Sequence, residues 1–267
     1  MTNSSDAVGY ELRGPVAWLR LQRPEKMNAI DPDVLSGLTA GLARALSDDA
    51  RAVALTGTGA VFCAGADLEF IFANAQDVTV IAHLLEASGQ VMRTIARHPT
   101  PVIAAVNGTA LAGGFELVLA CDLVVAAETA TLGDGHAKFG LFPGAGGSIR
   151  LPRLVGANRA RELMFTGRSA TAAEMRDYGV VSQVVPDDEL DSVVQKLGEQ
   201  LARTSALALA RMKRVVNEAA DLPLDEALAL ELKVAGEHLA SPDVAEGLAA
   251  FAGGRRPSFP STPKDLS

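Results

Sequence analysis

The sequence predicts an α/β fold with helices packed on a parallel sheet. In the first half of the chain, strand-like and helix-like segments alternate, as they do where parallel strands are joined by helical connections. Residues 102–106 are continuously apolar, which is typical of a strand buried on both faces. With 267 residues, of which 48% are hydrophobic, the chain is long enough to form a single large core.

Local patterns place the elements of the first half in order. We expect strands at 16–21, 52–56, 102–106 and 123–126, helices from Asp31 to about 46, from about 80 to 97 and from about Phe115, and weak patterning over 68–80. The first helix has the clearest start, because Asp31 is a suitable N-cap and Pro32 fits the first helical turn. Its apolar face is expected to carry Leu35, Leu38, Leu42 and Leu46.

The second half is predominantly helical. The expected features are a helix near 148–154, a capping box formed by Thr171 and Glu174, a short strand at 180–185, helices over most of 187–251 with a late start at Ser241-Pro242, and a frayed end from Pro257. We place a domain boundary between a core of residues 1–195 and a helical region of residues 196–267. This Ala- and Leu-rich region is suited to covering the core or packing against another subunit.

Composition and charge exclude several classes of protein. No apolar stretch reaches the roughly eighteen residues that a membrane span needs, and the N-terminus lacks the basic and apolar segments that mark secretion. The net charge of -8 argues against nucleic acid or an anionic membrane as a partner. The two cysteines, Cys63 and Cys121, have neither disulfide nor metal spacing, so we expect a cytoplasmic protein without a metal site.

The segment from Pro101 to Asp122 is the most informative for function. Glu116 stands among apolar residues, and a carboxylate so placed must find a partner, shift its pKa or take part in chemistry. Just before it, Gly113 and Gly114 let the backbone approach a ligand closely and offer N–H groups at a helix start. Amide donors beside a carboxylate indicate a site that stabilises an oxyanion and moves a proton.

A second loop is predicted to join this site. Residues 63–67 follow one predicted strand, and residues 112–116 follow the next. Loops after neighbouring parallel strands meet at one edge of a sheet. The N–H groups of Ala66 and Gly113 are therefore expected to converge on one carbonyl oxygen.

Other candidate motifs carry less chemistry. Segments 57–59 and 144–147 are rich in glycine, but they lack the lysine of a nucleotide-binding loop and the acidic residue that follows a dinucleotide-binding loop. We therefore discount nucleotide hydrolysis and dinucleotide redox chemistry. No basic residue adjoins Cys63 or Cys121 in sequence, so both are expected to fill the core and not to act as nucleophiles.

Motifs along nearly the whole chain resemble the crotonase superfamily, which comprises enoyl-CoA hydratases and isomerases. The resemblance rests on Arg23-Pro24 with Asn28-Ala29, FCAGADL at 62–68, PVIAAVNGTALAGGFELVLACD at 101–122, FPGAGGSIRLPRLVG at 142–156, GRSATAAEMRDYGVVSQVVP at 167–186 and SPDVAEGLAAFAGGRRPSF at 241–259. It implies a spiral of β-β-α turns. It also implies a helical C-terminal region that covers the active site and builds homotrimers, often paired into hexamers.

The resemblance further implies a substrate and the residues that bind it. An acyl-CoA thioester would place its carbonyl oxygen between the amides of Ala66 and Gly113, which form the oxyanion hole. Coenzyme A, as part of the substrate and not as a cofactor, would contact Lys26, Met27, Ala64, Ala66, Asp67 and Leu68 in one region and Phe251 with Arg255 in another. Family members often have a lysine at the position of Gly254, which Arg255 or Arg256 is expected to replace. No metal or redox cofactor is implied.

The chain departs from the hydratase pattern at the catalytic pair. Hydratases of the family use two glutamates; the first matches Glu116 and the second aligns with His136. A histidine, with an unperturbed pKa of about 6.5, can still donate or accept a proton near neutral pH. We therefore expect hydration of a 2-enoyl-CoA with Glu116 and His136 as the acid/base pair. Asp134 either orients His136 or ends a strand, and we favour the second interpretation.

Several alternatives stay open. The same site suits double-bond isomerisation or hydrolysis of a C–C or thioester bond, since each of these passes through an enolate or oxyanion. Outside the enzymes, the alternative is a protein that binds acyl-CoA without turnover, although such a binder has no need of Glu116 and His136. Glu116 is otherwise a structural carboxylate bonded to backbone amides. A peptidase is disfavoured, because no Ser–His pair with a nucleophile motif is visible.

Overall fold

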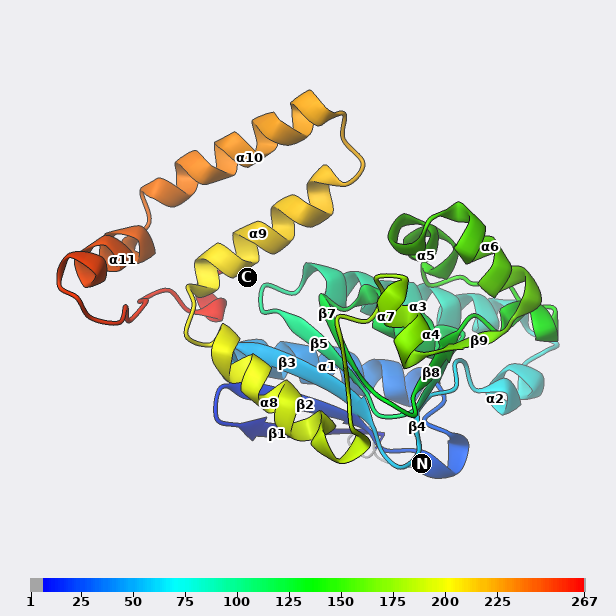
Figure 1. Cartoon of the computed structure of the whole chain (residues 1–267). Coiled ribbons are helices and arrows are strands. Elements are labelled where there is room, and N and C mark those ends of the chain that lie inside the picture. The colour runs from blue at the N-terminus through cyan, green and yellow to red at the C-terminus, as the bar shows by residue number, and fades with distance from the viewer. Residues whose placement is uncertain (1–6, 267) are drawn as a thin grey trace.

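The structure, a computed structural model, describes residues 7–266 and contains two sheets. The six-stranded sheet has the order β1-β2-β3-β5-β7-β10, and the four-stranded sheet has the order β4-β6-β8-β9 (Figure 1). The larger sheet consists of β1 (Val8–Arg13), β2 (Val16–Leu21), β3 (Ala52–Gly57), β5 (Val102–Val106), β7 (Leu123–Ala127) and β10 (Gln183–Val185). The smaller sheet consists of β4 (Val61–Cys63), β6 (Thr109–Leu111), β8 (Thr131–Gly133) and β9 (Ser169–Thr171).

Each turn of the chain contributes one strand to each sheet. The consecutive pairs are β3 with β4, β5 with β6, and β7 with β8, and within each sheet these strands run parallel. Helices α2 (Leu68–Ala73) and α3 (Val78–Arg97) follow the first pair, and α4 (Gly113–Ala120) follows the second. This arrangement is the expected spiral of β-β-α turns, so the predicted fold class is confirmed.

Helices cover both faces of the larger sheet, and every residue of β3 and β5 is buried. On one face lies α1 (Pro32–Ser47), which begins as predicted: Asp31 caps it by accepting a hydrogen bond from the backbone N–H of Val34 at 2.9 Å. On the other face lies α8 (Leu190–Leu201). The apolar side of α1 buries Leu35, Leu38 and Leu42, whereas Leu46 is only half-buried.

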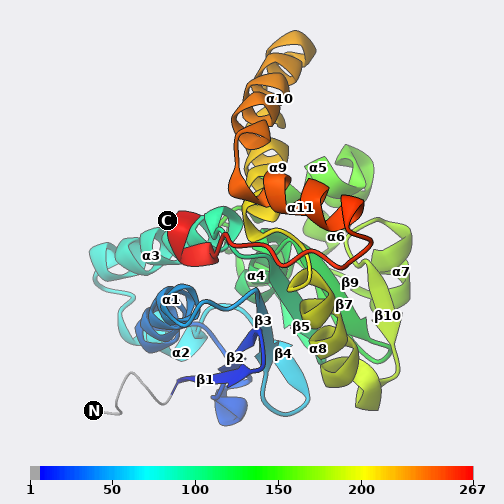
Figure 2. The same ribbon diagram turned by 90° about the vertical axis from the view of Figure 1, so that its left-hand side faces the viewer.

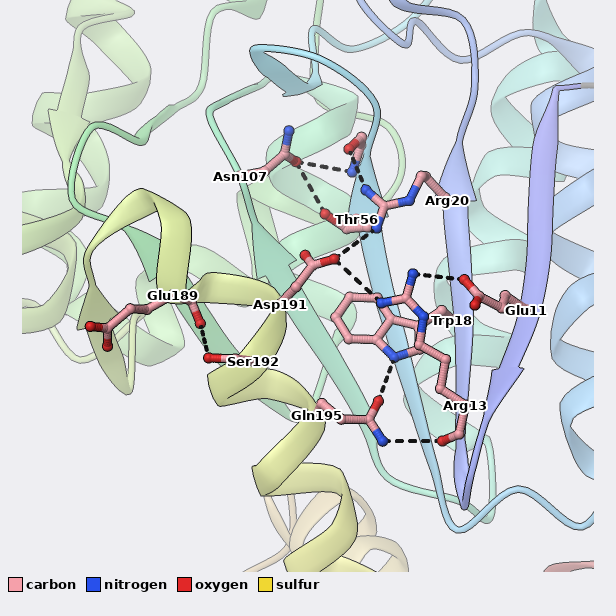
Figure 3. Close-up of polar contacts among 11 residues, drawn as sticks. Glu11, Arg13, Trp18, Arg20, Thr56, Asn107, Glu189, Asp191, Ser192 and Gln195 are labelled. Carbon is pink, nitrogen blue, oxygen red and sulfur yellow. Dashed lines mark hydrogen bonds and ion pairs between the residues drawn. The ribbon is translucent and has the colours of Figure 1, made fainter.

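Polar contacts fix α8 against β1 and β2 (Figure 3). The buried indole of Trp18 donates its Nε1–H to Oε1 of Gln195 at 2.9 Å, and Gln195 donates in turn to the backbone oxygen of Arg13 at 3.1 Å. The Arg13 guanidinium lies 4.9 Å from the centre of the Trp18 ring and also pairs with Asp191. These contacts hold α8 on one face of the larger sheet.

The C-terminal helices form an arm that projects from the core (Figures 1 and 2). The arm consists of α9 (Ala206–Ala219), α10 (Leu224–Leu239) and α11 (Pro242–Ala252). After α11 the chain returns, and the short helix η4 (Pro263–Leu266) packs on α1 and α9. The expectation of a frayed end from Pro257 is therefore wrong over the described residues, because the backbone N–H of Ser261 donates to the buried carboxylate of Asp243 at 3.1 Å.

Several element boundaries differ from those expected. The short strands β4, β6, β8 and β9 were not predicted, because three residues are too few to show a period. Helix α4 begins at Gly113 and not at Phe115, α3 begins at Val78, and the strand expected over 180–185 is confined to β10. The remaining helices are α5 (Gly147–Val155), α6 (Ala157–Thr166) and α7 (Ala172–Asp177), and the capping box of Thr171 and Glu174 at the start of α7 is confirmed.

Two further observations concern the organisation of the chain. The boundary placed between residues 195 and 196 falls inside α8, so the proposed division into two domains stays a prediction. Among the described residues, no helix is long and apolar enough to cross a membrane.

We predict that Gln195→Ala lowers the free energy of unfolding by about 1–3 kcal/mol, because it removes the acceptor of the buried Trp18 indole. Denaturant unfolding followed by the fluorescence of Trp18, the single tryptophan, measures the change. Gln200→Ala, on the exposed side of the same helix, is the matched control and should alter stability by less than about 0.5 kcal/mol. Equal effects of the two substitutions would show that the Trp18–Gln195 contact does not stabilise the fold.

Candidate active site

The first loop of the site follows β4. At Gly65 the backbone takes a φ of 104°, which favours glycine, and the chain then runs beside Ile30. Ile30 accepts a hydrogen bond from Asp67 N at 2.8 Å and donates to the oxygen of Gly65 at 2.7 Å. Both bonds use the peptides on either side of Ala66, so the Ala66 N–H points away from Ile30. It donates to no carbonyl or side chain within the described residues.

The second loop follows β6, the parallel neighbour of β4, and ends at the start of α4. Gly113 is the first residue of α4, where a backbone N–H has no acceptor within its own helix. An added Cβ on Gly113 would lie 3.5 Å from the nitrogen of Ala66, so the two amides are adjacent. The structure thus brings together the N–H groups of Ala66 and Gly113, as expected, although through the short strands of the smaller sheet.

Close backbone packing keeps the two loops together. A Cβ on Gly114 would lie 2.1 Å from the backbone oxygen of Cys63, so only glycine fits between α4 and the end of β4. Ala112, the N-cap of α4, has a φ of 48° and a ψ of -118°, a conformation that is strained for any residue except glycine. The strain turns the chain sharply from β6 into α4 and directs the Gly113 N–H toward the Ala66 loop.

Glu116 lies in the first turn of α4, and all eight residues of that helix are buried. Its Oε1 accepts hydrogen bonds from Ala145 N at 2.9 Å and from Gly147 N at 2.7 Å. The loop can present both N–H groups because Gly146 has a φ of 116°. The glycine-rich segment 144–147, which we discounted as a phosphate-binding loop, therefore binds a carboxylate of the chain itself.

His136 faces the second oxygen of this carboxylate. It begins the short helix η2 (His136–Phe139), which follows β8, and its Nε2 lies 3.9 Å from Glu116 Oε2. Its Nδ1 lies 2.9 Å from Oδ1 of Asp134. The interpretation that Asp134 only ends a strand is therefore wrong, because the buried Asp134 carboxylate also contacts the His136 ring.

The surroundings change the pKa of both groups. Burial raises the pKa of Glu116 and outweighs the opposing effects of the Gly147 and Ala145 amides and of His136. Burial alone would lower the pKa of His136, but the hydrogen bond and charge of Asp134, together with the charge of Glu116, raise it above its ordinary value. Where Glu116 has lost its proton and His136 still holds its own, a carboxylate faces an imidazolium. Such a pair can accept one proton and donate another.

Most of the residues expected to bind coenzyme A lie beside the Ala66 loop. Met27 accepts a hydrogen bond from Ala64 N at 3.1 Å through its backbone oxygen, and Lys26 pairs with Glu69 at the start of α2. Asp67 caps α2, whose first residue is Leu68. Met27 and Leu68 are exposed and Lys26 is half-buried, and the three residues form a surface next to the oxyanion donors.

Two buried or half-buried residues, to which the sequence assigned no role, hold that surface in place. Asn28 donates its Nδ2–H to the oxygen of Val61 at 2.7 Å and accepts a hydrogen bond from Arg23 N at 3.0 Å. The Arg23 guanidinium pairs with Asp67 at 3.1 Å. Both residues belong to a motif that was noted in the sequence. Their structural roles could not be predicted, because their partners lie some 40 residues away in the chain.

Phe251 and Arg255 are not brought to the site within this chain. Phe251 lies on α11 and is 87% exposed, and α11 is on the opposite side of the molecule from α2 in Figure 1. Arg255 pairs with Glu246 at 2.6 Å. Cavities of about 690 and 680 Å³ lie beside α3, but neither is lined by a residue of the predicted acid/base pair or oxyanion hole.

Cysteine chemistry does not contribute to this site. Cys63 is buried at the end of β4, and burial raises the pKa of its thiol to about 12. Burial likewise raises the pKa of Cys121. Within residues 7–266, no group of three His, Cys, Asp or Glu side chains is arranged to hold a metal ion.

We predict that Ala112→Gly raises the free energy of unfolding by about 1 kcal/mol, because it relieves the strained backbone at the N-cap of α4. Thermal or denaturant unfolding measures the change. Ala120→Gly, at the end of the same helix, is the matched control and should destabilise the protein by about 1 kcal/mol, since its backbone is helical. Destabilisation by both substitutions would contradict the assignment of strain to Ala112.

Comparison with known proteins gives one consistent result. The family model for enoyl-CoA hydratase/isomerase matches residues 11–262. YngF of Bacillus subtilis (strain 168), named as an enoyl-CoA hydratase/isomerase, is 37% identical over 246 residues, which are 90% of this chain and 93% of that protein. The enoyl-CoA hydratase structure from Bacillus anthracis has a TM-score of 0.90 and 35% identity, and the match covers 95% of this chain and 98% of that one.

A second solved structure agrees with the first. The enoyl-CoA hydratase from Polaromonas sp. JS666 has a TM-score of 0.91 and 35% identity, with coverage of 94% of this chain and 99% of that chain. The match extends over both sheets, which position the paired amides and Glu116, and over the helical arm. The chain belongs to the enoyl-CoA hydratase/isomerase family of enzymes.

Proposed function

We propose that this enzyme hydrates 2-enoyl-CoA thioesters. The observation that carries the proposal is the distance of 3.9 Å between Glu116 Oε2 and His136 Nε2. Glu116 lies in α4, whose first residue, Gly113, offers an oxyanion donor. The names of the relatives, which include both hydratases and isomerases, support the same reaction class. The chain supplies the groups that the addition of water to a conjugated thioester requires.

The Ala66 and Gly113 amides bind the thioester oxygen. Nucleophilic attack on an enoyl thioester moves negative charge onto that oxygen as the enolate forms. Two preorganised N–H groups stabilise this charge without reorganisation, and the loss of one such donor from comparable sites costs about 3–4 kcal/mol in activation energy. Both donors are held in position because the first turn of α4 is buried and Gly114 packs closely against the backbone of Cys63.

The pair of Glu116 and His136 handles the water. A water molecule near both Oε2 and Nε2 gives its proton to the Glu116 carboxylate while its oxygen forms a bond to the β-carbon. The imidazolium of His136 then gives a proton to the α-carbon, and the enolate becomes a saturated thioester. Transfer of the proton from Glu116 to His136, across the 3.9 Å between Oε2 and Nε2, restores the starting state. The net reaction is the addition of one water molecule across one double bond, and both side chains return to their starting protonation states.

The remaining assignments follow from this chemistry. Coenzyme A binds along Lys26, Met27, Ala64, Asp67 and Leu68 as part of the substrate, and the reaction needs neither a metal nor a redox cofactor because amides and two proton-transfer groups suffice. Two free cysteines, one buried and one half-buried, are compatible with a reducing compartment, and we propose the cytoplasm. Fatty acid metabolism is the setting that enoyl-CoA hydration implies.

We further propose that the protein assembles as a homotrimer or a dimer of trimers. The arm exposes large apolar side chains, which a second copy would bury: Met212, Val216, Leu224, Leu232, Leu239 and Phe251. In such an assembly the arm of one chain covers a neighbouring site. Phe251 and Arg255 then contact the coenzyme A bound by another copy.

Isomerisation of the double bond is the alternative that a specific observation favours. His136 stands where hydratases of the family have a second glutamate. Isomerisation adds no water and only moves a proton from one carbon to another, so it does not need two carboxylates that share a water molecule. The ratio of hydration to double-bond migration therefore distinguishes the two reactions. Binding without any turnover is the outcome that would favour a carrier or sensor.

We predict that wild type hydrates enoyl-CoA substrates in a panel from crotonyl-CoA to long chains. Glu116→Gln and His136→Gln should each reduce kcat by about 10²- to 10⁴-fold, because each removes a proton-transfer group. Glu86→Gln and His83→Gln, both at exposed positions of α3, are matched controls and should keep full activity. Activity of His136→Gln equal to wild type, or a gain of hydration in His136→Glu, would contradict the assigned pair.

We also predict a particle mass three or six times that of the 27.7 kDa chain in light scattering. Leu232→Lys, on the exposed face of α10, should reduce the mass toward that of one chain because it buries a charge at the interface. Phe251→Ala should raise KM for the acyl-CoA more than it lowers kcat. A monomeric wild type with full activity would overturn the assembly.

A further inference from the structure

Asp134 makes two contacts with a single residue. Its Oδ1 accepts a hydrogen bond from the backbone N–H of His136 at 3.1 Å and lies 2.9 Å from the Nδ1 of the same residue. Both side chains are buried, with Asp134 3% and His136 8% exposed. Burial of a carboxylate is unfavourable unless the group accepts hydrogen bonds. Both contacts of Asp134 are made with His136, the residue that faces Glu116.

We propose that Asp134 is a positioning residue that fixes the His136 ring with a proton on Nδ1 and holds it in the protonated state needed to donate from Nε2. The proposal rests on the function proposed above. Asp134 does not contact Glu116 directly. Its contacts are with Nδ1 and with the backbone N–H of His136, and only its charge reaches Glu116.

The tautomer follows from the chemistry of the two groups. An ionised carboxylate only accepts hydrogen bonds, so the Nδ1 that contacts Asp134 carries a proton. The exchangeable position is then Nε2, which is the ring nitrogen that faces Glu116 Oε2. With the opposite tautomer, the lone pair would face Asp134 and repel it. Asp134 thus determines which nitrogen meets the substrate.

The charges around the ring determine how firmly it holds a second proton. The charged groups that act on His136 are Asp134 and Glu116, and both stabilise the imidazolium. Asp134 also acts on Glu116, since its negative charge raises the pKa of that carboxyl. Removal of the Asp134 charge therefore lowers the pKa of His136 and the pKa of Glu116. Two carboxylates flank one imidazolium, and the pair works over a window that Asp134 moves to higher pH.

Asp134 has a structural role that must be separated from this one. The bond from Oδ1 to the N–H two residues later closes a turn, and Gly135 between them has open space around it. Asparagine keeps an oxygen that accepts this N–H but carries no charge. Asp134→Asn therefore preserves the turn and removes the electrostatic effect, whereas Asp134→Ala removes both.

The test compares Asp134→Asn with wild type in two measurements. In the pH dependence of kcat/KM, wild-type activity rises as Glu116 loses its proton and falls as His136 loses its proton. In Asp134→Asn both limbs should move to lower pH. Activity on the alkaline side of the wild-type profile should fall, because a lower His136 pKa leaves less of the imidazole protonated there. The second measurement is NMR titration of the four histidines, in which His136→Gln identifies the signal of His136.

The controls separate positioning from folding. Asp243→Asn removes another buried carboxylate, which accepts hydrogen bonds from Ser205 and Ser261 on the arm, and should leave the His136 titration unchanged. At a pH where Glu116 is ionised with or without the Asp134 charge, the double variant Asp134→Asn with His136→Gln should lose no more activity than His136→Gln alone, because the hydrogen bonds of Asp134 are made to His136. Asp134→Ala is expected to lower stability as well, through loss of the turn.

The outcomes distinguish this inference from the proposed function. A His136 pKa that falls in Asp134→Asn, with the Nδ1–H tautomer present in wild type, supports the role of Asp134 even if no enoyl-CoA is turned over. An unchanged His136 pKa and tautomer in folded Asp134→Asn would overturn it, whatever the activity. An additive loss in the double variant, at a pH where Glu116 stays ionised, would likewise show that Asp134 acts on something other than His136.

Discussion

The site depends on the burial of one carboxylate. Glu116 is 3% exposed in a fully buried helix, where an ionised carboxyl without partners would be strongly disfavoured. The N–H groups of Ala145 and Gly147 make its burial possible by occupying Oε1. Because these donors hold one oxygen, the other oxygen is left toward His136. Glu116 and His136 face each other in this way because the loop before α5 folds around Glu116.

The spiral fold explains how distant segments meet at this carboxylate. Each β-β-α turn brings one loop to the same end of the smaller sheet: the loop after β4 carries Ala66, the loop after β6 carries Gly113, and the segment after β8 carries His136. Parallel neighbours with matched lengths place these groups side by side. The strain at Ala112 and the close approach of Gly114 to Cys63 are costs of this convergence at the site.

The sequence was sufficient to predict much of the fold and the pairing of the Ala66 and Gly113 amides, but not the partners of Glu116 and Asp134. The buried strand at 102–106 and the cap at Asp31 are local patterns, and the pairing of Ala66 with Gly113 follows from parallel loops meeting at one edge. The short strands were missed because three residues show no period. The partners of Glu116 and the contact of Asp134 with His136 were missed because a carboxylate's acceptor bonds depend on which backbone N–H groups tertiary folding brings to it.

The central claim is that this site binds a thioester carbonyl between the amides of Ala66 and Gly113, with its reacting carbons facing Glu116 and His136. The most direct measurement is a crystal structure of the protein with an unreactive acyl-CoA thioester. The account predicts the thioester oxygen at about 2.7–3.1 Å from both amide nitrogens, as in oxyanion sites generally. A thioester oxygen that contacts neither amide, with the acyl chain turned away from Glu116, would contradict it.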